Sequence, residues 1–140
     1  MIQQVFKLPE QRRATFARQQ RELVELLRAM VVGPSGSCER MHALFVDNAR
    51  SYLGDTPIGN GAAGSLSMRI RELFQAALSV DAHGIILAHN HPSGLCRPSA
   101  YDIEATRKLK AIAQMLDIEL LDHLIFTTGA VYSMRAGGQL

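Results

Sequence analysis

The spacing of apolar residues divides the chain into segments of helical and of strand character. From Glu10 to Met30, apolar side chains recur every three or four residues, which predicts one amphipathic helix that ends before Gly33 and Pro34. Similar spacing predicts helices from Met68 to Val80 and from Ala100 to Leu116. The residues expected to face the core are Phe16, Leu23, Leu26 and Leu27 in the first helix, Ile70, Leu73, Phe74, Ala77 and Leu78 in the second, and Ile103, Leu109, Ile112 and Leu116 in the third.

Short apolar runs between these helices are typical of strands, and turn-forming residues separate them. The runs are Met41 to Val46, Ser51 to Ile58, Gly84 to His89, and the pair Ile118 to Thr127 and Ala130 to Met134, which predicts a hairpin around Gly129. A glycine-rich loop is expected from Gly59 to Gly64. Strands and helices alternate irregularly, so the pattern favours an α/β fold in which helices pack on a sheet.

Composition limits the size and the compartment of the protein. A chain of 140 residues with 47% hydrophobic residues fits one domain, residues 1–140. Two cysteines are too few for a disulfide scaffold, which indicates reduced thiols in a cytoplasmic protein. The opening residues, MIQQVFKLPEQRR, contain no long apolar stretch, so neither a signal peptide nor a membrane span is expected.

The positive charge is concentrated in arginines near the start of the chain. The net charge is only +2, but five arginines lie between Arg12 and Arg28, within an arginine-rich helix and loop over residues 1–35. Such a cluster could contact nucleic-acid phosphates or an acidic partner. Glu10, Glu22 and Glu25 are interleaved with the same arginines, so an ordinary solvated helix face is the favoured interpretation.

The residues with the clearest chemical pattern follow the strand that ends at His89. In the sequence HNHPSG, His89 and His91 are two residues apart, so on extended chain their imidazoles point to the same side. Asp102 falls in the first turn of the next helix, where its carboxylate can return toward the strand end. Two histidines and one carboxylate leave the fourth position of a zinc ion open, as in catalytic sites, where bound zinc lowers the pKa of water to about 7.

A structural interpretation of the same residues needs no metal. Ser99 and Asp102 have the S-x-x-D spacing of a helix capping box, and an Asp102 carboxylate that binds a metal would be only partly available for capping. His42 and His83 are expected to be ordinary surface or core residues. The spacing alone does not choose between cap and metal site.

The sequence from His89 onward resembles a known family. His89-x-His91 followed by Ser99-x-x-Asp102 is similar to the JAMM (MPN-type) metalloprotease motif, and HNHPSG, PS-x-x-D and LLDHLIF together resemble the JAB domain of the RadC family. The resemblance implies a single three-layer domain, a mixed sheet flanked by helices with the cytidine-deaminase-like JAB/MPN architecture, and a metal-site core over residues 39–140. It also implies one Zn²⁺ held by His89, His91 and Asp102, with Ser99 bonded to the reacting oxygen or the water.

The resemblance further implies an upstream glutamate that moves a proton between water and the leaving amine. Glu39, just before the strand-like RMHALFV, is the preferred candidate, and Glu72 in the second helix is the alternative. The implied activity is that of a zinc metallopeptidase cleaving a peptide or isopeptide bond. A peptide or protein substrate, with ubiquitin-like proteins among those implied, is expected, while the substrate itself and the oligomeric state are left open.

Two other functions remain as alternatives. One is a nucleic-acid-associated accessory protein with a structural zinc; a helix-hairpin-helix module typical of full-length RadC-type proteins is not seen ahead of the core, which weakens this reading. The other is a non-catalytic MPN scaffold. Cys96, in the loop after His91, could approach the metal but is more simply a loop residue. The G-x-G-x-x-G pattern from Gly59 to Gly64 lacks the rest of a dinucleotide-binding domain, so that function is not favoured.

Overall fold

The computed structural model describes residues 10–32, 38–62 and 67–140, and these form three helices and six strands. The expected helices and strands are present with small changes at their ends. In chain order the elements are α1 (Glu10–Val31), β1 (Cys38–Val46), β2 (Tyr52–Ala62), β3 (Ser67–Met68), α2 (Ile70–Ser79), β4 (Gly84–Asn90), α3 (Ala100–Met115), β5 (Glu119–Phe126) and β6 (Val131–Ser133).

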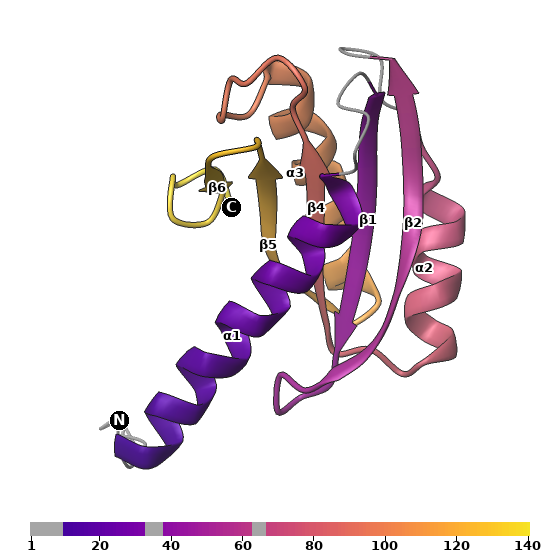
Figure 1. Ribbon diagram of the computed structural model, residues 1–140. Helices are drawn as coiled ribbons and strands as arrows, with labels where there is room; N and C mark the ends of the chain where they lie inside the picture. The colour runs from indigo at the N-terminus through magenta and orange to yellow at the C-terminus, as the bar shows by residue number, and fades with distance from the viewer. Residues whose placement is uncertain (1–9, 33–37, 63–66) are drawn as a thin grey trace.

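All six strands belong to one mixed sheet, in the order β3-β2-β1-β4-β5-β6. The central pair, β4 and β5, is parallel and the other pairs are antiparallel. Two parallel neighbours need a crossover connection, and α3 supplies it. The chain therefore leaves the carboxyl end of β4 and enters α3 close to that same edge of the sheet (Figure 1).

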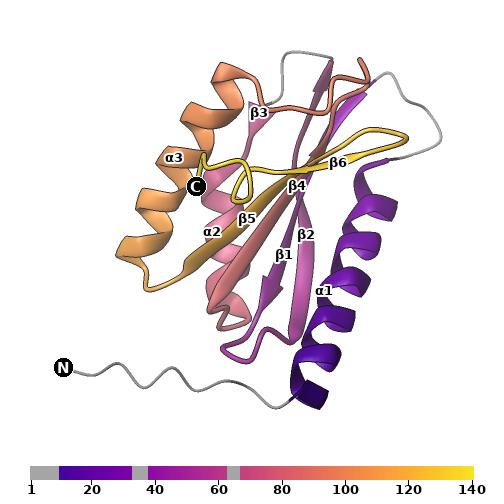
Figure 2. The ribbon, with the colours of Figure 1, turned by 90° about the vertical axis from the view of Figure 1, so that its left-hand side faces the viewer.

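Helices cover both faces of the sheet, which confirms the three-layer α/β domain. Figure 2 shows α1 on one side and α2 with α3 on the other. Because side chains alternate along a strand, β1 sends Met41, Ala43 and Phe45 toward α2 and α3, and Leu44 and Val46 toward α1. Each set joins a separate buried apolar cluster, one on each face of the sheet.

Two details of the expected elements are wrong, the glycine-rich loop and part of the core. Gly59 to Ala62 are not a loop, because they extend β2 and pair with β1, for instance Glu39 with Gly61. Strand formers are sparse there, and pairing with β1 outweighs local preference. The dinucleotide fingerprint fails for the same reason, since it requires a turn at these glycines. Four residues expected in the core have exposed side chains, namely Leu26, Ile70, Leu78 and Leu116. The side chain of Phe16 lies outside the described ones, so its place in the core stays a prediction.

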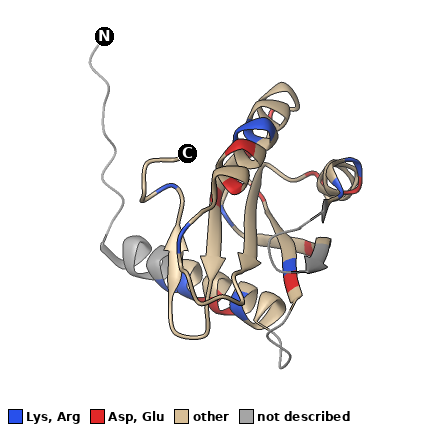
Figure 3. Cartoon of the chain, turned by 90° about the horizontal axis from the view of Figure 1, so that it is seen from above, with Lys and Arg blue, Asp and Glu red and all other residues tan. Residues whose placement is uncertain are grey.

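Two arginines of α1, Arg18 and Arg28, are paired with acidic residues of the same helix. Arg18 lies 3.1 Å from Glu22, and Arg28 lies 3.7 Å from Glu25. Figure 3 shows blue and red segments close together along this helix. Arg28 also stacks on the Phe126 ring at 5.0 Å. This arrangement supports a solvated helix face, and within the described ranges no helix has the length and apolar character to cross a membrane.

Candidate metal centre

The predicted ligands meet where β4 ends and α3 begins. His89 is completely buried near the end of β4, and His91 follows the strand, its backbone N–H bonded to the Phe126 carbonyl of β5. Asp102 lies in the first turn of α3 and is also buried. The crossover from β4 to β5 brings this turn back over the strand end, as expected from the sequence.

Three ligand atoms converge. His89 Nε2 lies 2.8 Å from His91 Nε2 and 3.4 Å from Asp102 Oδ2, and His91 Nε2 lies 3.2 Å from the same oxygen. One ligand atom from each residue falls within 4.8 Å of the others, so the group could hold a metal ion. Two imidazole nitrogens and one carboxylate oxygen are ligands that Zn²⁺ accepts, and three protein ligands leave a coordination position open.

The charges of the group also suit a cation. Burial acts to raise the pKa of Asp102, but hydrogen bonds with His89 and His91 and the charge of His89 hold that pKa well below its usual range. The carboxylate is therefore ionised. His91 donates from Nδ1 to the Leu95 carbonyl at 2.8 Å, which directs Nε2 to the group. The hydrogen bond to Asp102 raises the pKa of His91, against the effect of burial.

Helix capping and ligand geometry coexist at Asp102. The Ser99 hydroxyl accepts the Asp102 N–H at 3.0 Å, and the Ser99 N–H donates to Asp102 Oδ2 at 2.8 Å, which is a complete capping box. The same Oδ2 faces both histidines. The capping hydrogen bonds hold the Asp102 carboxylate where it faces both histidines. The helix cap and the metal site, which the sequence presented as partly competing interpretations, are therefore compatible.

Glu39 lies beside the group, in a cleft of about 490 Å³. It shares this cleft with His91, Ser99 and Asp102, and its negative charge contributes to the raised pKa of His91. Glu39 is two residues before Met41, the β1 partner of His89, and therefore lies on the same face of the sheet as His89. A cleft of about 520 Å³ between α1 and β5 contains none of the predicted site residues.

Asn90, which the sequence did not single out, fixes the backbone around Glu39. The Asn90 side-chain oxygen accepts the Arg40 N–H at 2.6 Å, and its side-chain nitrogen donates to the Cys38 carbonyl at 3.0 Å. The backbone pairing of β1 with β4 runs from Val46 and Gly84 to Met41 and His89, and the Asn90 side chain joins the two strands beyond that point. Its position in the sequence between His89 and His91 is the feature that could have drawn attention to Asn90.

His123 supports His89 from behind. His123 is completely buried on β5, and its Nε2 lies 2.7 Å from His89 Nδ1. On its other side, His123 Nδ1 lies 2.7 Å from the hydroxyl of Thr106 in α3. Burial and the charge of His89 place the pKa of His123 well below its usual range. Asp122, its neighbour in sequence, instead stays within the hairpin, bonded to Ser133 and to the Arg135 N–H.

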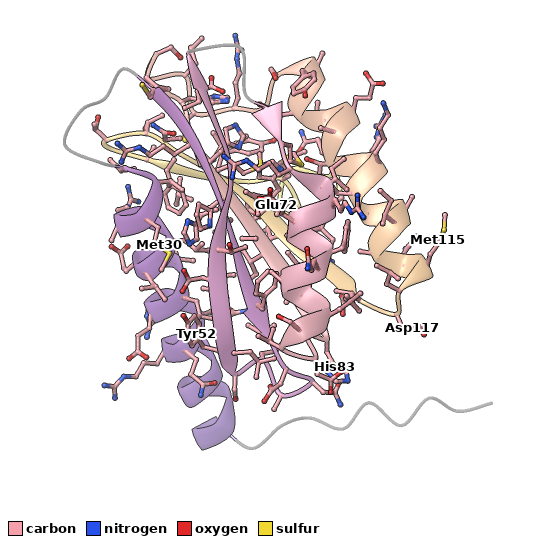
Figure 4. All side chains as sticks on the ribbon, turned by 90° about the vertical axis from the view of Figure 1, so that its right-hand side faces the viewer. Met30, Tyr52, Glu72, His83, Met115 and Asp117 are labelled. Atoms are coloured by element: carbon pink, nitrogen blue, oxygen red, sulfur yellow. The ribbon has the colours of Figure 1, made fainter. Side chains whose placement is uncertain are left out.

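The remaining candidates lie apart from the group. Glu72 is on the exposed face of α2, 3.3 Å from Arg69 (Figure 4). The Cys96 thiol donates to the Ile125 carbonyl at 3.4 Å and is a loop residue, as favoured from the sequence. His42 is paired with Asp55, and His83 is exposed in the turn before β4. The expectation that these two histidines are ordinary is confirmed.

The three-layer fold and the histidine–aspartate group at its strand edge define a JAB-type domain with a candidate metal centre. Comparison with family models agrees, because residues 17–139 match the RadC-like JAB domain. The chain belongs to this family, and the resemblance noted in its sequence is confirmed.

The chain is similar to several bacterial UPF0758 proteins. A UPF0758 protein of Acidithiobacillus ferrooxidans is 39% identical over 102 residues, covering 72% of this chain and 46% of the relative. A UPF0758 protein of Finegoldia magna is 38% identical over 73% of this chain and 47% of its own length. One of Chlorobaculum tepidum is 36% identical over 96% of this chain and 62% of its own length. The chain thus spans less than two thirds of these relatives.

Proposed function

We propose that this domain is a zinc-dependent hydrolase that cleaves a peptide or isopeptide bond. The observation that carries the proposal is the grouping of Glu39 and Ser99 with two of the three candidate ligands, His91 and Asp102, around one cleft. A metal site alone would serve a structural role as well. A carboxylate and a hydroxyl beside an open metal position are what amide hydrolysis needs.

The residues of the chain would divide the work as follows. His89, His91 and Asp102 hold the ion, which when bound polarises a carbonyl and acidifies water. Glu39 accepts a proton from the attacking water and returns it to the leaving amine. The Ser99 hydroxyl accepts the Asp102 N–H, so its own hydrogen stays available for the oxygen that gains negative charge in the transition state.

The walls of the cleft support an extended peptide segment as substrate. Besides the polar group, the cleft is lined by Pro92, Leu95, Pro98 and Tyr101, and Leu95 and Tyr101 have exposed side chains. Arg97 adds a positive charge at the same place. Apolar walls with few polar groups are usual in ligand sites, and the arginine favours a substrate with an acidic residue or a carboxylate near the scissile bond.

Two measurements on three proteins test the proposal. Zinc content by plasma mass spectrometry is compared for wild type, Asp102→Ala and Glu39→Gln, and cleavage is followed on fluorogenic peptides and isopeptide-linked di-ubiquitin. We expect about one zinc per wild-type chain, lost in Asp102→Ala and kept in Glu39→Gln. Cleavage should be abolished in both variants. Wild type that takes up no zinc on titration, or Glu39→Gln that cleaves like wild type, would refute the proposal.

A further inference from the structure

A buried chain of side chains runs from α3 through β5 to the first ligand. Thr106 and His123 are both completely buried, and His123 joins the Thr106 hydroxyl to His89 Nδ1 with contacts of 2.7 Å on either side. Neither Thr106 nor His123 lines the cleft. Any part that they play in the site therefore acts through His89.

The direction of the hydrogen bonds starts at Thr106. Its hydroxyl oxygen lies 2.6 Å from the backbone carbonyl oxygen of Asp102. A carbonyl has no hydrogen, so the single hydroxyl hydrogen of Thr106 must lie between the two oxygens. The sulfur of Met134, at 3.7 Å, is a far weaker acceptor for it. With its hydrogen committed, the Thr106 oxygen can only accept from His123 Nδ1.

The hydrogen positions on His123 and His89 follow from that of Thr106. A fully buried imidazole with no carboxylate against its ring is neutral and carries one ring hydrogen, which Thr106 locates on Nδ1. The carboxylate of Asp122 is directed to Ser133 and to backbone N–H groups, not to that ring. His123 Nε2 is then a lone pair, and the hydrogen in the 2.7 Å contact belongs to His89 Nδ1.

We propose that Thr106 and His123 are positioning residues that keep a hydrogen on His89 Nδ1, so that Nε2 is the nitrogen left to bind the metal. The inference deepens the proposed function and rests on its metal site. His91 keeps a hydrogen on Nδ1 by a simpler route, a bond from Nδ1 to the Leu95 carbonyl. Both ligand nitrogens are thus oriented by acceptors on the far side of their rings, which is how proteins raise the basicity of histidine ligands.

Removal of the Thr106 hydroxyl is the sharpest perturbation. In Thr106→Val the His123 Nδ1–H loses its acceptor, so His123 is free to place its hydrogen on Nε2 and donate it to His89 Nδ1. His89 would then carry its hydrogen on Nε2, where the metal binds. We expect zinc affinity to fall 10- to 100-fold, the range for lost support behind a histidine ligand. Thr106→Ser keeps the hydroxyl and should bind zinc within about threefold of wild type.

The experiment combines zinc titration against a competing chelator with ¹⁵N-edited NMR of the histidine rings in metal-free protein. The wild type and Thr106→Ser should show a hydrogen on His89 Nδ1, and Thr106→Val should show that hydrogen lost in part or in full. The NMR readout does not depend on zinc, so a wild type that binds no zinc would refute the proposed function while leaving the relay measurable. An unchanged His89 tautomer in Thr106→Val would overturn the inference, even if zinc binding weakened.

A second pair of variants protects the test against misfolding of Thr106→Val. His123→Gln keeps an acceptor oxygen for the His89 N–H, whereas His123→Leu removes it at similar size. Zinc affinity should fall 10- to 100-fold in His123→Leu and much less in His123→Gln. Equal losses in the two variants, with both folded by circular dichroism, would mean that His123 acts by packing alone and would overturn the proposed relay.

Discussion

Asn90 holds the backbone on both sides of Glu39 with a single side-chain amide. It binds the Arg40 N–H at 2.6 Å and the Cys38 carbonyl at 3.0 Å, and it is itself between the two histidine ligands in sequence. The proposed proton carrier and the proposed ligands are therefore coupled by one residue that touches neither the metal position nor the cleft.

Asn90→Ala should lower stability and the rate of cleavage while leaving metal binding unchanged. The Arg40 N–H and the Cys38 carbonyl lose their partner, which costs about 1–3 kcal/mol of unfolding free energy. Zinc content should stay at the wild-type level, while cleavage falls about 10- to 100-fold because Glu39 is no longer held in position. Urea unfolding, zinc analysis and peptide cleavage measure the three quantities. Asn48→Ala, in an exposed turn, is the control, and equal stability of the two variants would contradict the clamp.

Ser99→Ala tests the double role of the helix cap. The variant loses the acceptor for the Asp102 N–H, and we expect a loss of about 1 kcal/mol in stability. If Ser99 also stabilises the transition state, cleavage should fall about 100-fold or more while zinc is retained. Ser99→Thr keeps the hydroxyl and should be close to wild type in stability. Full activity in Ser99→Ala would leave the residue with capping alone.

Removal of the metal should lower thermal stability. A ligand that binds only the folded state stabilises it by about 2.7 kcal/mol at 100 times its Kd. For a domain of this size we expect chelation to lower the Tm by about 10 °C. Scanning calorimetry with chelator, and again after zinc is restored, measures the change. Asp102→Ala should show no such difference; a chelator effect of equal size in that variant would point to zinc bound elsewhere.

The hydrogen bonds of Asp55 on β2 with Tyr52 and His42 predict that stability depends on pH independently of the metal site. Burial acts to raise the pKa of Asp55, but hydrogen bonds with Tyr52 and His42 lower it overall. A carboxyl whose pKa is lowered by folding adds stability above its unfolded pKa of about 4, and that stability is lost as the pH falls through the folded value.

Asp55→Asn should therefore be less stable than wild type at pH 7, by up to about 1 kcal/mol given its partial exposure. The difference should shrink as the pH falls below about 4 and disappear once the pH is below the lowered pKa of the folded state. Urea unfolding across this pH range measures it. Asp117→Asn, in the exposed turn after α3 (Figure 4), makes the same charge change and should show no comparable trend. A difference independent of pH would contradict the assignment.

The sequence predicted most elements because their signals are local. The apolar periodicity of α3 and the Ser99–Asp102 spacing depend on neighbours a few residues apart, and the structure has both the helix and its cap. The extension of β2 through Gly59 to Ala62 was missed because it depends on pairing with β1, a contact between distant segments. Glycine-rich sequence has a low intrinsic preference for strands, and here the strand forms because the segment pairs with β1.

The same distinction applies within the candidate site. His89, His91 and Asp102 were predictable from spacing and resemblance, and their convergence follows from the crossover of α3. Thr106 carried no signal, because a threonine inside a helix has many ordinary reasons to be there. In the sequence His123 is distinguished only by following Asp122, and in the structure Asp122 bonds within the hairpin while His123 contacts His89. The contact between His123 and His89 depends on the pairing of β4 with β5, which the sequence does not reveal.

The three candidate ligands and the two residues behind His89 all lie within one continuous stretch, the β4–α3–β5 unit from Gly84 to Phe126. Glu39 comes from β1, a separate strand laid alongside that unit. In the proposed function, ion capture and bond cleavage are therefore encoded in different parts of the chain. A descendant that replaced Glu39 would keep an intact metalloprotein with its catalytic step removed, so within such a lineage the ability to bind metal can outlive the ability to cut.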